Sequence, residues 1–162
     1  MGGRYKAAVV TVSDGCWQGT RVDESGPAVV GILREAGFEV AVAEVVADEV
    51  DAIASALRRL ALEAELVVTT GGTGLAARDV TPEATRVVCE RMVEGLAERM
   101  RAAGAVETAM AALSRGVCGT LGRTLIVNLP GSVRGARTSL AAVVGVLPHA
   151  LDVLAGRTEH SK

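Results

Sequence analysis

Short apolar runs alternate with amphipathic stretches along most of the chain. Four runs rich in Val, Ala, Leu and Ile are predicted to be buried strands, at residues 7–12, 39–46, 66–70 and 124–129. Helical spacing of apolar residues predicts helices at about residues 26–36, 50–62, 81–92, 96–102, 108–113, 135–147 and 149–155. This alternation predicts one three-layer α/β/α domain over residues 1–162, with a mainly parallel central sheet and a core at about 5–156.

Turn-forming and capping residues set the predicted ends of these elements. Ser25 and Thr81 are each predicted to cap a helix whose first turn contains a proline. Gly95 is predicted to break the helix that begins near Thr81. Residues 13–24 are predicted as a turn and a loop, and the glycine-spaced residues 117–123 as an edge strand and a turn.

Three glycines follow the third predicted strand, and an aspartate follows the glycines. Gly71, Gly72 and Gly74 let backbone N–H groups approach an anion without obstruction by a Cβ atom. The helix predicted to begin near Thr81 adds positive potential at its N-terminus. Because the carboxylate of Asp79 beside a phosphate requires a cation between them, this stretch indicates a magnesium–phosphate site.

Three other interpretations apply to the same stretch. A strand–glycine–helix turn also occurs in α/β proteins for tight packing alone. Residues 72–77 fit the G-x-G-x-x-G/A string of dinucleotide-binding folds, but that string opens its helix directly, whereas here the helix begins near Thr81. The P-loop of nucleoside triphosphatases requires a GK[ST] sequence that this stretch lacks. Both nucleotide motifs are disfavoured, and the packing interpretation stays open.

Polar residues also follow the other predicted strands. Ser13 and Asp14 follow the first strand, Asp48 the second, and residues 128–132 the fourth. Ligands of open α/β sheets bind outside the carboxyl ends of the strands, so these residues and the glycine turn are expected to face one pocket. Asp48 and Asp79 would then share one magnesium ion. Taken singly, each polar residue is equally explained as a turn or cap residue, and Asp48 as an N-cap.

The composition narrows the class of protein. Hydrophobic residues make up 49% of the 162 residues and aromatics 2%, so the core must consist of Val, Leu, Ile and Ala. A formal net charge of −2 provides no basic surface for nucleic acid. No membrane-length apolar run or signal segment occurs, so a cytoplasmic location is expected. Cys16, Cys89 and Cys118 are far apart in sequence, which argues against a zinc site or a Cys–His nucleophile.

Six short motifs occur in the order found in one known family. They are Thr11-Val12-Ser13-Asp14, Asp23-x-Ser25-Gly26-Pro27, Thr70-Gly71-Gly72-Thr73-Gly74, Arg78-Asp79-Val80-Thr81-Pro82-Glu83, Ser114-Arg115-Gly116 and Asn128-x-Pro130-Gly131-Ser132. With these motifs the chain resembles, from about Tyr5 to Gly156, the molybdenum cofactor biosynthesis proteins of the MoaB/Mog type, which include the molybdopterin adenylyltransferases. Each motif alone is weak, but six in one order are highly specific.

The resemblance implies a homotrimer or a dimer of trimers that binds ATP, magnesium and molybdopterin. The family's reaction joins the terminal phosphate of the pterin to the α-phosphate of ATP and releases pyrophosphate. By position, Asp48 and Asp79 match the family's catalytic, metal-binding acids. The matched substrate- and nucleotide-binding positions are Ser13, Asp14, Thr70, Gly71, Gly72, Thr73, Gly74, Ser114, Asn128, Pro130, Gly131 and Ser132.

Two functions fit the resemblance. One is Mg-ATP-dependent adenylylation of molybdopterin, and the other is non-catalytic binding of molybdopterin or its precursor as a carrier. Both place a pterin against Ser114, Asn128 and Pro130, with hand-off to a molybdenum insertase as a further expectation. The presence of both acids favours the enzyme, because a carrier does not turn over ATP. A nicotinamide dehydrogenase is disfavoured by the late helix start.

Overall fold

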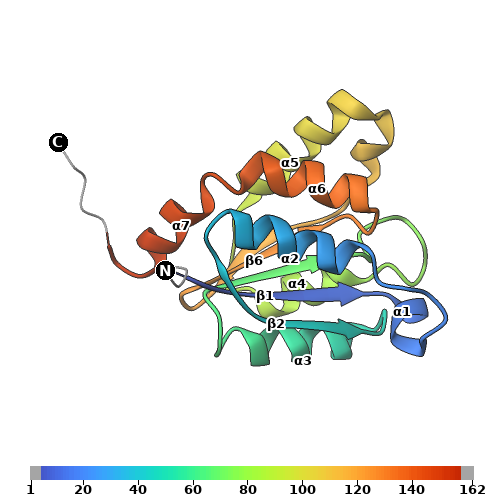
Figure 1. Cartoon of the computed structure of the whole chain (residues 1–162), viewed down its shortest axis with the longest axis horizontal. Coiled ribbons are helices and arrows are strands. Elements are labelled where there is room, and N and C mark those ends of the chain that lie inside the picture. The colour runs from blue at the N-terminus through green and yellow to red at the C-terminus, as the bar shows by residue number, and fades with distance from the viewer. Residues whose placement is uncertain (1–4, 158–162) are drawn as a thin grey trace.

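The computed structural model describes residues 5–157, and six strands form one mixed sheet (Figure 1). The strands are β1 (Lys6–Val12), β2 (Glu39–Val46), β3 (Leu66–Thr70), β4 (Arg91–Met92), β5 (Cys118–Leu121) and β6 (Thr124–Leu129). Their order across the sheet is β2-β1-β3-β6-β5-β4. Neighbours from β2 to β6 are parallel, and β5 is antiparallel to both β6 and β4. The predicted mainly parallel sheet is therefore confirmed.

Helices cover both faces of this sheet, as predicted. One face carries α2 (Ser25–Glu35), α5 (Glu94–Glu107), α6 (Val133–Val143) and α7 (Leu147–Leu154), and the other carries α3 (Val50–Leu60) and α4 (Thr81–Val88). Figure 1 shows α2 and α6 above the sheet and α3 below it. The short helix α1 (Asp14–Gln18) and the 3-10 helix η1 (Ala109–Leu113) complete the described helical segments.

Alternate residues of the central strands enter two separate apolar layers. Ala7 and Val9 of β1 belong to the layer that contains α2, and Ala8 and Val10 belong to the layer that contains α3. All four side chains are at most 1% exposed. Because both faces of such a strand are buried, its sequence is a continuous apolar run instead of an alternating one. This double burial holds the carboxyl ends of β1, β3 and β6 at one edge of the molecule.

Four expectations of secondary structure are wrong. Residues 14–18, expected in a loop, form α1, and the Ser13 hydroxyl caps it by accepting a hydrogen bond from the Cys16 N–H. The third predicted helix ends at Val88, and β4 follows because it pairs with β5, which no local pattern reveals. Gly95 lies within the first turn of α5 instead of breaking a helix. Finally, β5 lies between β6 and β4 and is not an edge strand.

Two of the expected helix caps also differ. Ser25 lies inside α2, and the Asp23 carboxylate instead accepts a hydrogen bond of 2.9 Å from the Gly26 N–H. Thr81 is the first residue of α4, and its hydroxyl donates to the Gly71 carbonyl at 2.9 Å. The Thr81 side chain therefore ties the helix to the glycine turn instead of capping it.

The described chain ends beside α7. Residues 158–162 lie outside the described residues, and Arg157 forms an ion pair of 3.2 Å with Asp152. Within residues 5–157, no single helix is long and apolar enough to cross a membrane. The consecutive helices α6 and α7 are together long and apolar enough, but the chain is bent by 60° at the break between them.

Candidate functional site

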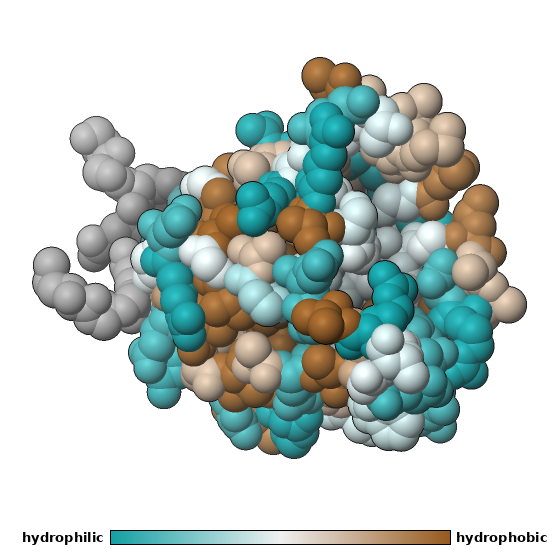
Figure 2. All heavy atoms as spheres, turned by 45° about the vertical axis from the view of Figure 1, so that its right-hand side comes forward, coloured by the Kyte–Doolittle hydropathy of each residue, from teal (hydrophilic) through white to brown (hydrophobic). Residues whose placement is uncertain are grey.

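Two adjoining cavities lie where the parallel strands end. One has a volume of about 600 Å³ and the other about 460 Å³. Both are lined by Gly72, Asp79, Gly131 and Ser132, so the loops after β3 and β6 form their common rim. Figure 2 turns this edge of the sheet toward the viewer and shows hydrophilic and hydrophobic residues interspersed over it. Of the site residues predicted from the sequence, only Asp14 lines neither cavity.

The larger cavity, called here the polar cavity, is surrounded by the ends of β1, β2 and β3. Its predicted members, besides the common rim, are Ser13, Asp48, Thr70 and Gly71. Charged residues of the segment before α2 complete its wall, namely Arg21, Asp23 and Glu24. The polar cavity therefore suits a charged ligand.

Asp14 and Asp48 are joined by two reciprocal hydrogen bonds. The Asp14 N–H donates to Asp48 Oδ2 at 2.7 Å, and the Asp48 N–H donates to Asp14 Oδ1 at 2.9 Å. Arg78 adds two bonds to the Asp14 carboxylate, from Nε at 2.9 Å and Nη2 at 3.0 Å. Asp14 is therefore a support for Asp48 and not part of the cavity wall. The alternative of Asp48 as an N-cap is not supported, because Glu49 occupies that position without a side-chain cap bond.

The surroundings of the two carboxyl groups shift their pKa values in opposite directions. The hydrogen bond from Arg78 lowers the pKa of Asp14, with help from the Asp48 N–H. Burial raises the pKa of Asp48, and repulsion from the carboxylates of Asp14 and Asp79 adds to that increase. The charges of Asp48 and Asp79 therefore oppose each other across the polar cavity.

The pair formed by Asp48 and Asp79 fits a magnesium ion bound together with phosphate oxygens. Hard divalent cations of this kind take one or two protein carboxylates and complete their coordination with phosphates and water. A cation would also relieve the repulsion that raises the pKa of Asp48. Within residues 5–157, no group of three or more His, Cys, Asp or Glu side chains is placed to hold a metal by itself. The remaining ligands of such an ion would then have to come from a bound substrate and water.

The turn after β3 requires glycine at two positions. Gly71 has φ +100°, and a Cβ there would lie 2.3 Å from the Val12 carbonyl oxygen. Gly72 has φ +68°, and a Cβ there would lie 2.3 Å from Thr81 Oγ1 and 3.2 Å from Asp48 Oδ1. The left-handed backbone and the close neighbours both exclude a side chain. The turn therefore brings bare backbone next to the Asp48 carboxylate.

The turns after β3 and β6 are bonded to each other. The Thr70 hydroxyl donates to the Pro130 carbonyl at 2.7 Å, and the Gly71 N–H donates to the Leu129 carbonyl at 3.1 Å. Ser132 caps α6 by accepting a bond of 3.0 Å from the Gly135 N–H. Thr70 thus lines the polar cavity, but its hydroxyl holds the common rim together.

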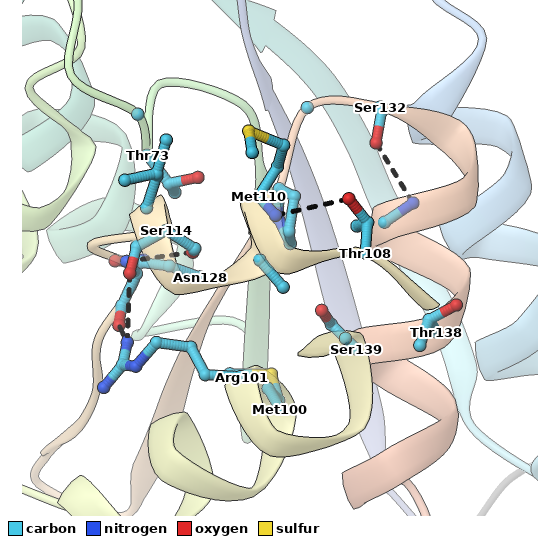
Figure 3. Close-up of a pocket in the computed structure, with 18 of the residues that line it drawn as sticks. Thr73, Met100, Arg101, Thr108, Met110, Ser114, Asn128, Ser132, Thr138 and Ser139 are labelled. Carbon is cyan, nitrogen blue, oxygen red and sulfur yellow. Dashed lines mark hydrogen bonds between the residues drawn. The ribbon is translucent and has the colours of Figure 1, made fainter. Parts of the chain in front are cut away.

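The smaller cavity, called here the apolar cavity, lies between α5, η1 and α6 (Figure 3). Its apolar wall includes Met100 and Met110, whose flexible thioethers adapt to a flat ring. Polar side chains stand on two sides of it in Figure 3: Ser114 and Asn128 on one, and Ser132, Thr138 and Ser139 on the other. Thr73, Gly74 and Pro130 also line this cavity. A planar ligand with polar substituents fits this arrangement.

The side chain of Asn128 is committed to internal hydrogen bonds. Its Nδ2 donates to the hydroxyls of Thr69 and Thr85, each at 3.0 Å, and its Oδ1 accepts from the Val117 N–H at 3.2 Å. Asn128 is 1% exposed. It borders the apolar cavity, but its amide fastens β6 to β3, α4 and the start of β5.

Several arginines around these cavities were not predicted as site residues, and three of them form bonds that shape the site. Arg78 holds Asp14, Arg101 donates to the Gly116 carbonyl at 2.9 Å, and Arg115 contacts the loop between the two cavities. Arg78 and Arg115 lie next to predicted site residues in the sequence, which was an available signal. The atoms that accept hydrogen bonds from these arginines belong mainly to residues distant in the sequence. The spacing of residues along the chain therefore does not identify the arginines as part of the site. Met100 and Met110 belong to no motif and gave no signal.

Comparison with known proteins reveals close sequence relatives. Residues 8–149 match the family described as a probable molybdopterin binding domain. The molybdopterin adenylyltransferase of Helicobacter pylori strain J99 is 40% identical over 155 residues, which cover 91% of this chain and 86% of that protein. The molybdenum cofactor synthesis protein cinnamon of Drosophila melanogaster is 42% identical over 90% of this chain, but the match spans only 25% of that protein.

Solved structures agree with the sequence relatives. The molybdopterin biosynthesis enzyme MoaB from Thermus thermophilus is 52% identical, with a TM-score of 0.89 over 94% of this chain and 97% of that chain. The molybdopterin biosynthesis Mog protein from Mycobacterium ulcerans is 39% identical, with a TM-score of 0.87 over 92% and 98% of the two chains. The chain therefore belongs to the molybdopterin-binding-domain family that includes the MoaB and Mog proteins.

Proposed function

We propose that the chain is a molybdopterin adenylyltransferase. It joins the terminal phosphate of molybdopterin to the α-phosphate of ATP, giving adenylyl-molybdopterin and pyrophosphate. One observation carries this proposal: two cavities of different chemistry share a rim that contains Gly72 and Asp79. A reaction between two substrates needs such a junction. The 40% identity to the Helicobacter pylori adenylyltransferase supports the same reaction.

In this proposal ATP occupies the polar cavity and the pterin occupies the apolar cavity. Asp48 and Asp79 would hold magnesium, which neutralises charge on the phosphates when bound. The turn at Gly71 and Gly72 gives phosphate oxygens close access to the backbone. Ser114 offers a hydroxyl to the pterin from the other side of the rim.

The protein's own part in the reaction is positioning and charge neutralisation. Phosphoryl-type transfers need little covalent help from side chains, and aligned reactants account for a large share of the rate. No thiolate is required, and burial raises the pKa of Cys89 to about 11 and that of Cys118 to about 12. The attacking group is the terminal phosphate of the pterin. The bonded turns at Thr70 and Pro130 keep the rim, where the two phosphates meet, in a fixed shape.

Assembly and cellular context extend the proposal. We propose a homotrimer or a dimer of trimers built from a single domain, located in the cytoplasm, that passes its product to a molybdenum insertase. Light scattering at micromolar concentration tests the assembly, and a monomer would refute it. The carrier function needs the apolar cavity alone, so it gives no role to Asp48 and Asp79.

The direct test is turnover. The purified protein is incubated with molybdopterin, ATP and magnesium under anaerobic conditions, and adenylyl-molybdopterin and pyrophosphate are measured. The proposal predicts both products in equal amounts, with no product when magnesium is omitted. Tight binding of molybdopterin without either product would identify a carrier, and no binding of molybdopterin would refute both functions.

A further inference from the structure

Arg115 is bonded to the loop that separates the two cavities. Its backbone N–H donates to the Thr73 carbonyl at 2.8 Å. Its guanidinium donates through Nε to the Gly74 carbonyl at 2.8 Å and through Nη2 to the Asp79 carbonyl at 2.7 Å. The remaining Nη1 forms an ion pair with Glu83 at the start of α4. One side chain therefore bonds both ends of the segment from Gly74 to Asp79.

The shape of this segment determines where the Asp79 carboxylate lies. Asp79 Oδ2 accepts a hydrogen bond of 3.0 Å from the Ala76 N–H, and the Asp79 N–H donates to the Ala76 carbonyl at 2.9 Å. A Cβ on Gly74 would come within 2.9 Å of the same Oδ2, so the carboxylate packs closely against the loop. A change in the loop must move the carboxylate with it.

Arg115 lines neither cavity among the described residues, and its side chain is 35% exposed. Its Nε, Nη1 and Nη2 all bond protein acceptors, which fits a supporting role better than contact with a ligand. The residue before it, Ser114, lines the apolar cavity. On the other side, Arg101 of α5 holds the Gly116 carbonyl at 2.9 Å. The segment around Arg115 is thus fixed to α5 on one side and to the Asp79 loop on the other.

We propose that Arg115 is a positioning residue. It fixes the position of the Asp79 carboxylate relative to Ser114, and so keeps the polar cavity and the apolar cavity aligned with each other. The inference rests on the proposed function. A guanidinium suits this role, because its Nε and Nη2 bond the two loop carbonyls at once in a fixed planar geometry, whereas a lysine ammonium is a single point charge on a flexible stem.

The first test compares Arg115→Lys with the wild-type protein in adenylylation at varied magnesium. We expect the magnesium concentration for half-maximal rate to rise about tenfold, because a misplaced carboxylate binds the ion poorly. The rate at limiting magnesium should fall roughly thirtyfold, since small displacements of reacting groups reach effects of a hundredfold. The Kd for molybdopterin should stay within about twofold, because the substitution does not touch the helices α5, η1 and α6 that form most of the apolar cavity. A role in stability alone would not shift the magnesium requirement selectively.

A second readout does not depend on turnover. Electron paramagnetic resonance measures the binding of Mn²⁺ with ATP, in the absence of any pterin. We expect Arg115→Lys to weaken this binding about five- to tenfold, because the lost bonds change the position of Asp79. If the wild-type protein makes no adenylyl-molybdopterin, the proposed function fails, and the Mn²⁺–ATP comparison still decides the positioning role.

Two matched variants serve as controls. Arg99→Lys removes a guanidinium that also bonds a backbone carbonyl, that of Ala142 at 2.6 Å, but away from both cavities. Glu83→Gln removes the ion pair of Arg115 but leaves its two carbonyl bonds to the loop. We expect both variants to keep the wild-type magnesium requirement.

The result for Arg115→Lys decides whether Arg115 positions Asp79. A folded Arg115→Lys protein with the wild-type magnesium requirement and Mn²⁺–ATP affinity would overturn the inference. If this variant does not fold, Arg115→Gln replaces it, because its shorter side chain cannot replace both carbonyl bonds made by Nε and Nη2 of Arg115. A raised magnesium requirement and weaker Mn²⁺–ATP binding in Arg115→Gln support the inference, and unchanged values overturn it.

Discussion

The two cavities share a rim but are built in different ways. The polar cavity is formed by short segments that directly follow β1, β2 and β3, and its chemistry comes from carboxylates and bare glycine backbone. The apolar cavity is formed mainly by the sides of α5, α6 and η1, and its chemistry comes from methionines and a few hydroxyls. We therefore expect charge to determine ligand binding in the polar cavity and shape to determine it in the apolar cavity.

This difference predicts that the two cavities respond differently to mutation. Loss of the charge of one carboxylate should lower the rate of catalysis strongly with little change in pterin affinity, because an amide of the same shape leaves the rim intact. Loss of one hydroxyl in the apolar cavity should weaken pterin binding slightly and leave the metal unaffected. Substitutions on each side therefore separate the roles of the two cavities.

The largest effect is expected for Asp79→Asn. Asparagine keeps the shape and still accepts the Ala76 hydrogen bond, but it removes the charge that would hold magnesium. Adenylylation should fall about a hundredfold or more, the scale seen when one electrostatic group is removed from an active site. Molybdopterin affinity should stay within about twofold, because asparagine keeps the shape of the rim beside the apolar cavity. Steady-state kinetics and pterin binding on the same preparation measure both.

The control for this variant is Asp51→Asn, an exposed aspartate in the first turn of α3. It should leave rate and affinity unchanged. If Asp79 were only a turn residue, Asp79→Asn would lower the melting temperature slightly and spare the rate. An unchanged adenylylation rate would therefore end the metal-site interpretation of this loop.

Asn128→Ala should mainly affect stability. The change leaves the Val117 N–H and the hydroxyls of Thr69 and Thr85 without their buried partner. The free energy of unfolding should fall by about 2–4 kcal/mol, because unsatisfied buried groups keep their full desolvation cost. Urea unfolding measures this loss. A stable variant that no longer binds molybdopterin would show instead that the amide is a ligand.

Ser114→Ala tests the apolar cavity with a smaller expected effect. Loss of one hydrogen bond to the pterin should raise the Kd for molybdopterin roughly three- to tenfold. The magnesium requirement should not change. Ser55→Ala, at an exposed position of α3, is the matched control. A change in magnesium requirement without a change in pterin affinity would contradict the division between the cavities.

The smallest effect is expected for the stability of the folded protein when the buried carboxylate of Asp48 is replaced. Burial raises its pKa in the folded protein, so the folded state holds this proton more tightly than the unfolded chain. Stability is therefore lost as the pH rises from the unfolded to the folded pKa, and the ionised carboxylate lowers stability at pH 7. Asp48→Asn should raise the Tm at pH 7 by about 1–3 °C.

The difference between this variant and the wild-type protein should disappear as the pH falls below the ordinary pKa of aspartate, where both side chains are neutral. Thermal unfolding at pH 7 and at low pH measures this difference. Asp51→Asn should show no such gain at pH 7. A lower Tm for Asp48→Asn at pH 7 would show that its bond to the Asp14 N–H outweighs the cost of burial.

The polar cavity was the more predictable of the two. Strands buried on both faces leave continuous apolar runs in the sequence, and the residues after them, such as Asp48 and Gly71, necessarily meet at one edge. The walls of the apolar cavity come from helix sides and from η1, where Met100 and Met110 follow no motif. Their place depends on how α5 and α6 pack, which periodicity does not reveal.

Local patterns also failed where long-range contacts decide the structure. The two-residue strand β4 exists only through its pairing with β5. Thr81 is of a residue type that is favoured at helix N-caps, but its hydroxyl donates to the Gly71 carbonyl ten residues earlier. By residue type alone, nothing distinguishes Arg115 from an ordinary surface charge. Its proposed role becomes apparent only from its bonds to the carbonyls of Gly74 and Asp79 in the structure. The assignment of one domain to residues 1–162 stays a prediction.

The most direct test of the account is a crystal structure of the protein with adenylyl-molybdopterin bound. The adenosine is expected to lie in the polar cavity and the pterin in the apolar cavity. Their linking phosphates should lie at the common rim, beside Gly72, Asp79, Gly131 and Ser132. Both halves of the product in one cavity, or phosphates away from Asp79, would contradict it.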